Sequence, residues 1–496
     1  MRKRTIIIGI LVAVILIVLA SLFIPRLLKP EPAPPQTYWP AQDWRTVTPE
    51  EQGFDSGKLA ELLQAVRDQN IGLDSLLIIR NGYLVLDATF YPYDNAFPHD
   101  LASVTKSVMT TLIGIAIDQG KIQLDQSMIS FFPDRIIANL DGRKEKITVR
   151  HLVSNVNGFE SGCMEGDMPT IQAMMADPDW VQHSLDRNVV HEPGDFFCYD
   201  SPGIHTLSAI LQEATGMTAL EFARQNLFAP LGISDVIWES DPQGYTRGWG
   251  DLHLKPRDAA RIGYLFLNLG VWEGKQIVSA KWVEEATKMQ HHAGSDDYGY
   301  GWWVEDEVYW AFGRGGQRVM VAPQYHLVIV TTASNFEFDQ IGPMLIAAFV
   351  DPKKPLPANR ANLAKLEAKV AEIAQATEPF PVSPLPDISK TISGKTYVFE
   401  SNPFNLTNLR LDFSNPTEAT LYLRAREGEE VWPIGLDGKF RLSIDGQALR
   451  GYWPDPQTLF VASLEIGRIT YQFHFEENGV VLTSPELGLK LEGQQE

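Results

Sequence analysis

The stretch Ser103-Val104-Thr105-Lys106 places a hydroxyl and an amine three residues apart, where an apolar, helix-like run over 103–119 begins. Positions i and i+3 of a helix share a face, so the lysine amine can reach the serine oxygen. A serine hydroxyl is a weak nucleophile until a neighbouring base takes its proton, and an amine held close by is such a base. The S-x-x-K pattern is typical of serine acyl-transfer enzymes. Taken alone, it also describes a helix N-cap serine followed by a solvated lysine.

Two further motifs lie downstream in an order that such chemistry needs. Tyr199-Asp200-Ser201 follows Pro193-Gly194 on a predicted loop, and a tyrosine beside an ammonium group is expected to lose its proton more easily and to relay it. Arg314-Gly315-Gly316-Gln317 is predicted to start a strand, where glycines allow a substrate to approach the backbone closely. The three motifs together predict an active site.

With these motifs the chain resembles the serine β-lactamase and penicillin-binding-protein superfamily. More narrowly, it is similar to class C β-lactamases and their esterase, D-aminopeptidase and 6-aminohexanoate-dimer hydrolase relatives. That family carries S-x-x-K, then Y-x-N or Y-x-S, then K-T-G or H-x-G, in this order. Four supporting stretches, at 149–153, 193–197, 254–258 and 299–303, also look like the family, and the resemblance spans roughly 50–348.

The resemblance implies roles for individual residues. Ser103 would be the acylated nucleophile, and Lys106 would be its base, sharing that work with Tyr199. Ser201 would hydrogen-bond within the network. In the third motif, Arg314 would stand where relatives have lysine or histidine, Gly315 and Gly316 would line the substrate site, and the N–H groups of Gln317 and Ser103 would form the oxyanion hole.

Two departures from the family pattern affect the expected substrate. Arg314-Gly315-Gly316 is not Lys-Thr-Gly, so the usual hydroxyl that binds a substrate carboxylate is missing. Ser201 replaces the asparagine of efficient β-lactamases. We therefore expect a serine hydrolase that acts through an acyl-enzyme on an ester, amide, peptide or β-lactam bond, with the balance away from antibiotics. The alternative is a catalytically inactive, membrane-anchored sensor or binding protein that retains the fold.

The amino-acid composition limits the classes of binding partner that are expected. The net charge of the 496 residues is −20, from 42 basic and 62 acidic side chains, which excludes nucleic acid as an expected partner. The sequence has no H-E-x-x-H and no CxxC, so neither a metal nor a cofactor is expected. A small-molecule or short-peptide substrate is expected instead.

The N-terminal segment indicates a location outside the cytoplasm. Basic residues 2–4 precede residues 5–24, which carry no charge and are long enough to span a bilayer. We expect a single-pass signal anchor with a cytoplasmic N-terminus, and secretion after signal cleavage is the alternative. In an oxidising compartment the two cysteines, Cys163 and Cys198, could form a disulfide or remain separate buried thiols.

Five segments are expected along the chain, and the fold class is α+β. They are a transmembrane helix (1–29), a proline-rich linker (30–45), the hydrolase-like domain (46–350), a linker with a short helix (351–386) and an all-β, barrel-like domain (387–496). Asn81-Gly82 predicts a hairpin between 76–80 and 83–87. Early and late strands (308–312, 318–322 and 327–332 among the latter) around helices at 103–119, 206–214, 256–269 and 280–288 predict a β-lactamase/transpeptidase-like antiparallel sheet flanked by helices. Short alternating strands follow at 395–399, 406–413, 419–425, 439–444 and 468–475.

Overall fold

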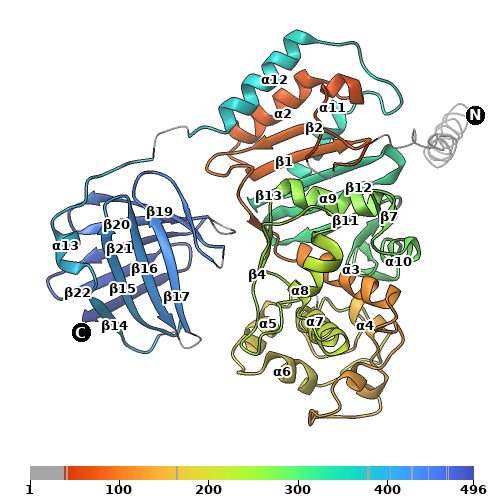
Figure 1. Ribbon diagram of the computed structural model, residues 1–496, viewed down its shortest axis with the longest axis horizontal. Coiled ribbons are helices and arrows are strands. Elements are labelled where there is room, and N and C mark those ends of the chain that lie inside the picture. The colour runs from red at the N-terminus through yellow and green to blue at the C-terminus, as the bar shows by residue number, and fades with distance from the viewer. Residues whose placement is uncertain are drawn as a thin grey trace, which may run out of the picture.

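The computed structural model consists of a main domain, with a sheet between helices, and a C-terminal β-barrel beside it (Figure 1). It describes residues 38–40, 43–163, 166–376, 380–402, 404–425, 428–444, 446–464, 466 and 468–496. The expected membrane span at 5–24 and most of the expected linker at 30–45 lie outside these residues. No helix within the described part of the chain is long and apolar enough to cross a bilayer.

An antiparallel sheet of eight strands forms the centre of the main domain. In spatial order, its strands are β2 (Tyr83–Thr89), β1 (Gly72–Arg80), β13 (Leu327–Asn335), β12 (Gln317–Ala322), β11 (Val308–Gly313), β10 (Trp303–Glu305), β9 (Asp296–Tyr298) and β8 (His291–Ala293). The hairpin predicted at Asn81-Gly82 is confirmed, because Arg80 of β1 pairs with Tyr83 of β2. Strands β1 and β13, from the beginning and the end of the main domain, are therefore neighbours in the sheet.

Strand β1 is apolar on both sides because helices cover both faces of the sheet. Leu77 and Ile79 point into the core that contains α3 (Val104–Asp118) and α9 (Pro256–Leu267). Leu76 and Ile78 point into the opposite core, which contains α2 (Ser56–Asp68) and α11 (Gly342–Ala348). Successive side chains of a strand face opposite sides, so a continuous apolar run fits a sheet buried on both faces.

Helix α12 (Arg360–Ile373) requires a correction to the expected domain boundaries. Residues 351–386 were expected to form a linker, yet Leu366 and Ile373 of α12 are buried in the same core as α2. The two side chains are seven residues apart, so they lie on one face of the helix. Helix α12 is therefore part of the outer layer of the main domain.

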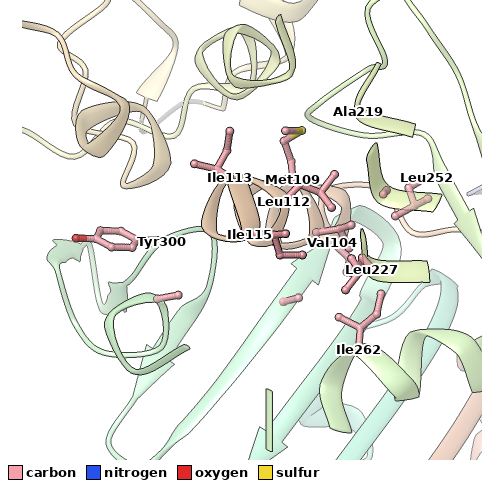
Figure 2. Packing of buried hydrophobic residues seen from close by; sticks show 14 of the residues in the cluster. Val104, Met109, Leu112, Ile113, Ile115, Ala219, Leu227, Leu252, Ile262 and Tyr300 are labelled. Atoms are coloured by element: carbon pink, nitrogen blue, oxygen red, sulfur yellow. The ribbon is translucent and has the colours of Figure 1, made fainter. Parts of the chain in front are cut away.

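Helix α3 is buried along most of its length. Every residue from Val104 to Ala116 is buried, including the polar residues Thr105, Lys106, Ser107, Thr110 and Thr111. Figure 2 shows Met109 and Ile113 on the side of α3 that faces other helices, and Ile115 on the side that faces the strands. Its first turn begins at the serine of the S-x-x-K motif, so the motif is held by the centre of the core.

A mostly helical region lies on the other side of α3 from the sheet (Figure 1). It contains α4 (Val149–Val153), α5 (Met168–Met175), α6 (Trp180–Asp186), α7 (Ser201–Thr215) and α8 (Ala219–Ala223), and α10 (Ala280–Ala286) packs on α3 from another side. A small sheet of β3 (His99–Asp100), β5 (Leu252–Leu254) and β4 (Ile237–Trp238) connects this region to the start of α3.

The C-terminal domain is a closed β-barrel. Its strands are β14 (Thr396–Phe399), β15 (Leu406–Asn415), β16 (Glu418–Ala425), β17 (Gly428–Gly435), β19 (Ala448–Asp455), β20 (Thr458–Ser463), β21 (Thr470–Phe475), β22 (Gly479–Ser484) and β23 (Leu489–Gln495). Parallel pairing of β17 with β19 closes the ring. The strand expected at 439–444 is reduced to β18 (Arg441–Leu442), which pairs with one end of β19.

Side chains between strands β20 and β21 dock the barrel on the main domain. Arg468 forms an ion pair of 2.7 Å with Asp74 of β1, whose side chain is 2% exposed. Burial raises the pKa of Asp74 to about 6, and the Arg468 guanidinium opposes that shift. Ile466 lies against Gly315, where a Cβ atom would come within 2.8 Å of it. The barrel therefore contacts the third motif directly.

We predict that Gly114→Ala destabilises the main domain. A Cβ atom on Gly114 would lie 2.5 Å from the indole of Trp282 on α10, and overpacking of this kind costs about 1–3 kcal/mol, more than the roughly 0.5–1 kcal/mol that alanine gains in a helix. Urea unfolding followed by tryptophan fluorescence measures the loss. Gly142→Ala is the matched control, because its Cβ would meet no atom within 4 Å. Equal midpoints for both variants would contradict the prediction.

Candidate active site

Ser103 lies at the N-terminus of α3, where Ala102 and Gly313 constrain the position of its backbone. Ala102 before it has a φ of 45°, which is uncommon for a residue with a side chain, and its N–H donates to Asp100 Oδ1 over 2.8 Å. A Cβ atom on Gly313 would lie 2.4 Å from the Leu101 carbonyl oxygen and 3.0 Å from the Ser103 nitrogen. Only glycine therefore allows β11 to approach the serine this closely.

The Lys106 amine contacts Ser103, as the i, i+3 spacing predicts. Its Nζ donates to Ser103 Oγ over 2.8 Å and to the backbone carbonyl of Trp249 over 2.9 Å. The ring centre of Tyr199 lies 4.8 Å from the same nitrogen. Lys106 is 1% exposed, so the amine lies in a closed site between a hydroxyl, a carbonyl and an aromatic face.

Burial changes the acid–base chemistry of Lys106. It lowers the pKa of this amine to about 8. Negative charges on Asp167, Asp251 and Asp200 oppose the shift without outweighing burial. Roughly a tenth of the lysine is therefore neutral at pH 7, whereas a solvated lysine is almost wholly protonated there.

Tyr199 lies beside the same hydroxyl, but its proton is held more firmly than the sequence predicts. Burial raises the pKa of Tyr199, and a hydrogen bond with Ser103 only partly opposes this. The expectation that an adjacent ammonium makes this tyrosine easier to deprotonate is therefore wrong, because burial raises its pKa and the negative charge on Asp167 adds to the rise. The phenol is the protonated partner in the site and Lys106 is the more accessible base.

Asp200, between the two other residues of its motif, fixes the position of this segment. Its carboxylate accepts two hydrogen bonds from Arg187, at 2.7 and 2.9 Å, and one from Asn157 at 3.0 Å. The Asp200 side chain is fully buried, so these donors compensate for the loss of water. The aspartate therefore has a structural role that orients Tyr199.

Ser201 is the first residue of helix α7, and its side chain does not make the expected hydrogen bond. Its N–H donates to Asp167 Oδ2 over 2.8 Å. Its Oγ atom is buried and has no hydrogen-bond partner among the described residues, so the expected bond within the network is absent there.

A disulfide ties a second loop to this segment. Cys163 and Cys198 are bonded, with their Cα atoms 4.6 Å apart. Cys198 directly precedes Tyr199, and Asp167 on the second loop binds the Ser201 N–H. The tyrosine is therefore held on both sides by the segment that contains Cys163 and Asp167.

The third motif forms a tight turn that leads into the predicted strand. Residues Arg314–Gly316 join β11 to β12, with φ angles of 83° at Gly315 and 103° at Gly316 that favour glycine. Strand β12 begins one residue later, at Gln317. Arg314 is exposed, so its guanidinium is available to solvent and to a ligand.

Gln317 holds this turn with its side chain. Its Oε1 accepts the Ala333 N–H over 3.1 Å, and its Nε2 donates to the carbonyl oxygens of Ala333 and Arg314. The backbone of Gln317 pairs with Gly313, the residue that approaches the Ser103 nitrogen. The two residues whose N–H groups are expected to bind an oxyanion, Ser103 and Gln317, are therefore both neighbours of Gly313.

The three motifs meet at one place, although they are about a hundred residues apart from one another in sequence. Sequence reasoning found Ser103, Lys106 and Tyr199, but it missed two partners of the lysine. The Trp249 carbonyl is a backbone group with no signature in the sequence. Asp167 belongs to no motif, and the sequence does not decide whether Cys163 pairs with Cys198.

Comparison with known proteins agrees with this arrangement. Residues 59–348, more than half of the chain, match the family model described as beta-lactamase. The 6-aminohexanoate-dimer hydrolase of Paenarthrobacter ureafaciens is 25% identical over 287 residues, which cover 53% of this chain and 72% of that protein. The monacolin J acid methylbutanoyltransferase of Aspergillus terreus is 26% identical over 158 residues, which cover 29% of this chain and 38% of that protein.

A solved structure gives the same fold. A candidate 6-aminohexanoate-dimer hydrolase from Bacillus anthracis superposes with a TM-score of 0.53 at 21% identity, covering 64% of this chain and 90% of that one. At this identity the likeness concerns the fold alone. The family match covers all of the main-domain segments that hold the three motifs, and the chain therefore belongs to the beta-lactamase family, within the serine β-lactamase and penicillin-binding-protein superfamily.

Proposed function

We propose that the protein is a serine hydrolase that acts through an acyl-enzyme formed on Ser103. The observation that carries the proposal is the 2.8 Å hydrogen bond between the Ser103 hydroxyl and a buried lysine amine whose pKa is lowered to about 8. An amine with this pKa can accept the serine proton near neutral pH, which activates the nucleophile. An inactive binding protein has no need for such a base beside a hydroxyl.

The proposed cycle moves one proton around the site. Ser103 Oγ attacks the substrate carbonyl carbon while Lys106 Nζ takes the serine proton. The N–H groups of Ser103 and Gln317 stabilise the resulting oxyanion. Tyr199 gives its phenolic proton to the leaving oxygen or nitrogen as that bond breaks, and Lys106 returns a proton to the phenolate. Water then attacks the acyl carbonyl carbon and gives a proton to Lys106, the bond to Ser103 Oγ breaks, and the lysine returns the proton to that oxygen as the acid leaves.

The third motif supports an ester or an unstrained amide as substrate rather than a β-lactam. Position 315 is a glycine, so the site has no hydroxyl there for a substrate carboxylate. Arg314 offers the nearest positive charge of the motif, but it is exposed and therefore well screened. Binding of a carboxylate at this end of the site would be weak.

We also propose that the protein acts outside the cytoplasm, anchored by residues 5–24. The uncharged run after basic residues 2–4 supports this location. The disulfide between Cys163 and Cys198 supports it independently, because such bonds persist in oxidising compartments.

Ser103→Ala should abolish both labelling by a fluorophosphonate or penicillin probe and turnover of p-nitrophenyl esters, because the acyl group has no other acceptor. Gel fluorescence and ester hydrolysis measure the two effects. Ser130→Ala, at an exposed serine, is the control and should behave as wild type. Full turnover by the Ser103 variant would overturn the proposal, and a wild-type protein inert to every probe would favour the binding protein.

Tyr199→Phe should slow acylation by roughly 10²–10⁴-fold, because the leaving group then departs without its proton donor. Single-turnover kinetics with an ester and with its matched amide measure the effect. The amide should suffer more, since an amine leaving group needs a proton more than a nitrophenolate does. An unchanged acylation rate would remove Tyr199 from the mechanism.

The activity should rise with pH until the lysine is neutral. Protonated Lys106 cannot accept the serine proton, so kcat/KM should increase about tenfold per pH unit below about pH 8 and level off above it. A pH profile of ester hydrolysis at constant ionic strength gives the midpoint. A midpoint near pH 4–5 would instead indicate a carboxylate base and contradict the role of Lys106.

A further inference from the structure

A buried pair, His205 and Asp241, lies next to the candidate active site and takes no part in the proposed cycle. Both side chains are fully buried, and His205 Nε2 lies 3.0 Å from Asp241 Oδ2. Burial lowers the pKa of His205, and the charge on Asp241 opposes this without outweighing it, so the imidazole is neutral near pH 7. Of the other charged groups that act on it, Arg247 lowers this pKa and Asp179 raises it.

The carboxylate of Asp241 determines which nitrogen of the neutral imidazole carries the proton. Its Oδ1 accepts the backbone N–H groups of Gln243 over 2.9 Å and of Tyr245 over 2.8 Å. Its Oδ2 remains for His205, and an ionised carboxylate can only accept, so Nε2 is the protonated nitrogen. Nδ1 is therefore an acceptor, and it receives a long hydrogen bond of 3.4 Å from the Gly248 N–H.

The same imidazole supports the residue after Gly248. The ring of Trp249 meets that of His205 edge to face, with centres 5.0 Å apart and planes 89° apart. A Cβ atom on Gly248 would lie 2.7 Å from the Ile204 carbonyl oxygen, so glycine is needed for this segment to lie against α7. His205 therefore holds Trp249 both by its ring and by the backbone that leads to it.

The carbonyl of Trp249 is the group that orients the Lys106 amine. Nζ contacts this carbonyl oxygen over 2.9 Å and Ser103 Oγ over 2.8 Å. A neutral amine has two N–H bonds and one lone pair, and it can accept the serine proton only when the lone pair faces Oγ. An N–H that donates to a fixed carbonyl turns the lone pair towards the serine, and without that acceptor the amine can rotate away.

The proposed function, on which this inference rests, makes Lys106 the base that activates Ser103. We propose that His205 and Asp241 are positioning residues for this base, because they hold the Trp249 carbonyl that orients the Lys106 amine towards the serine. The contacts form an unbroken path from the Asp241 carboxylate through the imidazole and Trp249 to Nζ.

Asp241→Asn tests this path with almost no change of shape. The asparagine Oδ1 would still accept the two backbone N–H groups, so its amide N–H would face His205 Nε2 and make that nitrogen the acceptor. The imidazole proton would then lie on Nδ1, opposite the Gly248 N–H, and the two donors would repel each other. With Trp249 displaced, the plateau of kcat/KM for a p-nitrophenyl ester should fall roughly tenfold to a hundredfold.

The pH profile separates positioning from packing. The Trp249 carbonyl accepts a hydrogen bond from the protonated amine, so losing it removes a contact that favours the charged form of Lys106. The midpoint for Asp241→Asn should therefore move from about pH 8 to about pH 7. Loss of the Asp241 charge does not by itself produce this shift, because the acidic groups that act on the amine are Asp167, Asp251 and Asp200.

Two substitutions of His205 leave the Asp241 charge in place and test the acceptor nitrogen. His205→Asn puts an amide oxygen near the position of Nδ1, where it can accept the Gly248 N–H, whereas His205→Leu has no acceptor. The leucine variant should show the same loss and the same shift as Asp241→Asn. The asparagine variant should keep several-fold more activity than the leucine variant, with a midpoint closer to that of wild type. This pair decides the matter if Asp241→Asn does not fold.

Ser208→Ala is the matched control. Ser208 is buried on α7 and donates to the Thr246 carbonyl over 2.6 Å, so its loss weakens the same packing three residues before Trp249. Urea unfolding should show a loss of stability comparable to that of Asp241→Asn, while the pH midpoint stays at the wild-type value and the plateau within about twofold of it.

An unchanged or raised pH midpoint in Asp241→Asn, equal activities of the two His205 variants, or the same downward shift in Ser208→Ala would each overturn the positioning role. In those cases Ser103-dependent turnover by the wild-type protein, with its midpoint near pH 8, would show that the proposed function still holds. A wild-type midpoint near pH 4–5 would remove Lys106 as the base, and the inference would fall with it.

Discussion

The removal of the Lys106 amine from water is the constraint on which the rest of the site depends. A solvated lysine is protonated and of no use as a base at neutral pH, whereas this one has a pKa lowered to about 8 by burial. The buried helix α3 provides the enclosure, and the carbonyl of Trp249 and hydroxyl of Ser103 satisfy the nitrogen within it. Direct contact with an acidic side chain would raise the pKa of Lys106 again. The nearby Asp200 is instead paired with Arg187.

Motif order and spacing predicted the centre of this site well, because a short helical spacing and a hairpin are local properties. The i, i+3 spacing placed Lys106 on Ser103, and Asn81-Gly82 placed the first hairpin. Properties that depend on residues distant in the sequence could not be predicted from the motifs. The pKa of Tyr199 depends on how much water the fold removes, and the turn at Arg314–Gly316 depends on where β11 ends. Helix α12 looked like a linker because only one narrow face of it is buried.

The position of Tyr199 is secured by elements outside the core of the fold. The disulfide at Cys198 and the N–H of Ser201 join it to the loop of Cys163 and Asp167, while Trp303 supports the ring from the sheet. In the proposed cycle Tyr199 gives up and regains a proton, and its ring must not rotate between those steps, since a small misplacement slows a reaction greatly. Covalent and aromatic contacts provide that rigidity at a position where the chain is otherwise a loop.

The contact between Ile466 and Gly315 couples the shape of the barrel to the shape of the turn in the main domain. A methyl group of the barrel occupies the space in which a side chain at position 315 would begin, so the missing hydroxyl and the docked barrel are two aspects of one shape. A threonine at position 315 would meet Ile466 of the barrel, so one of the two side chains would have to move. Substitutions at positions 315 and 466 are therefore expected to depend on each other, although the two residues belong to different domains.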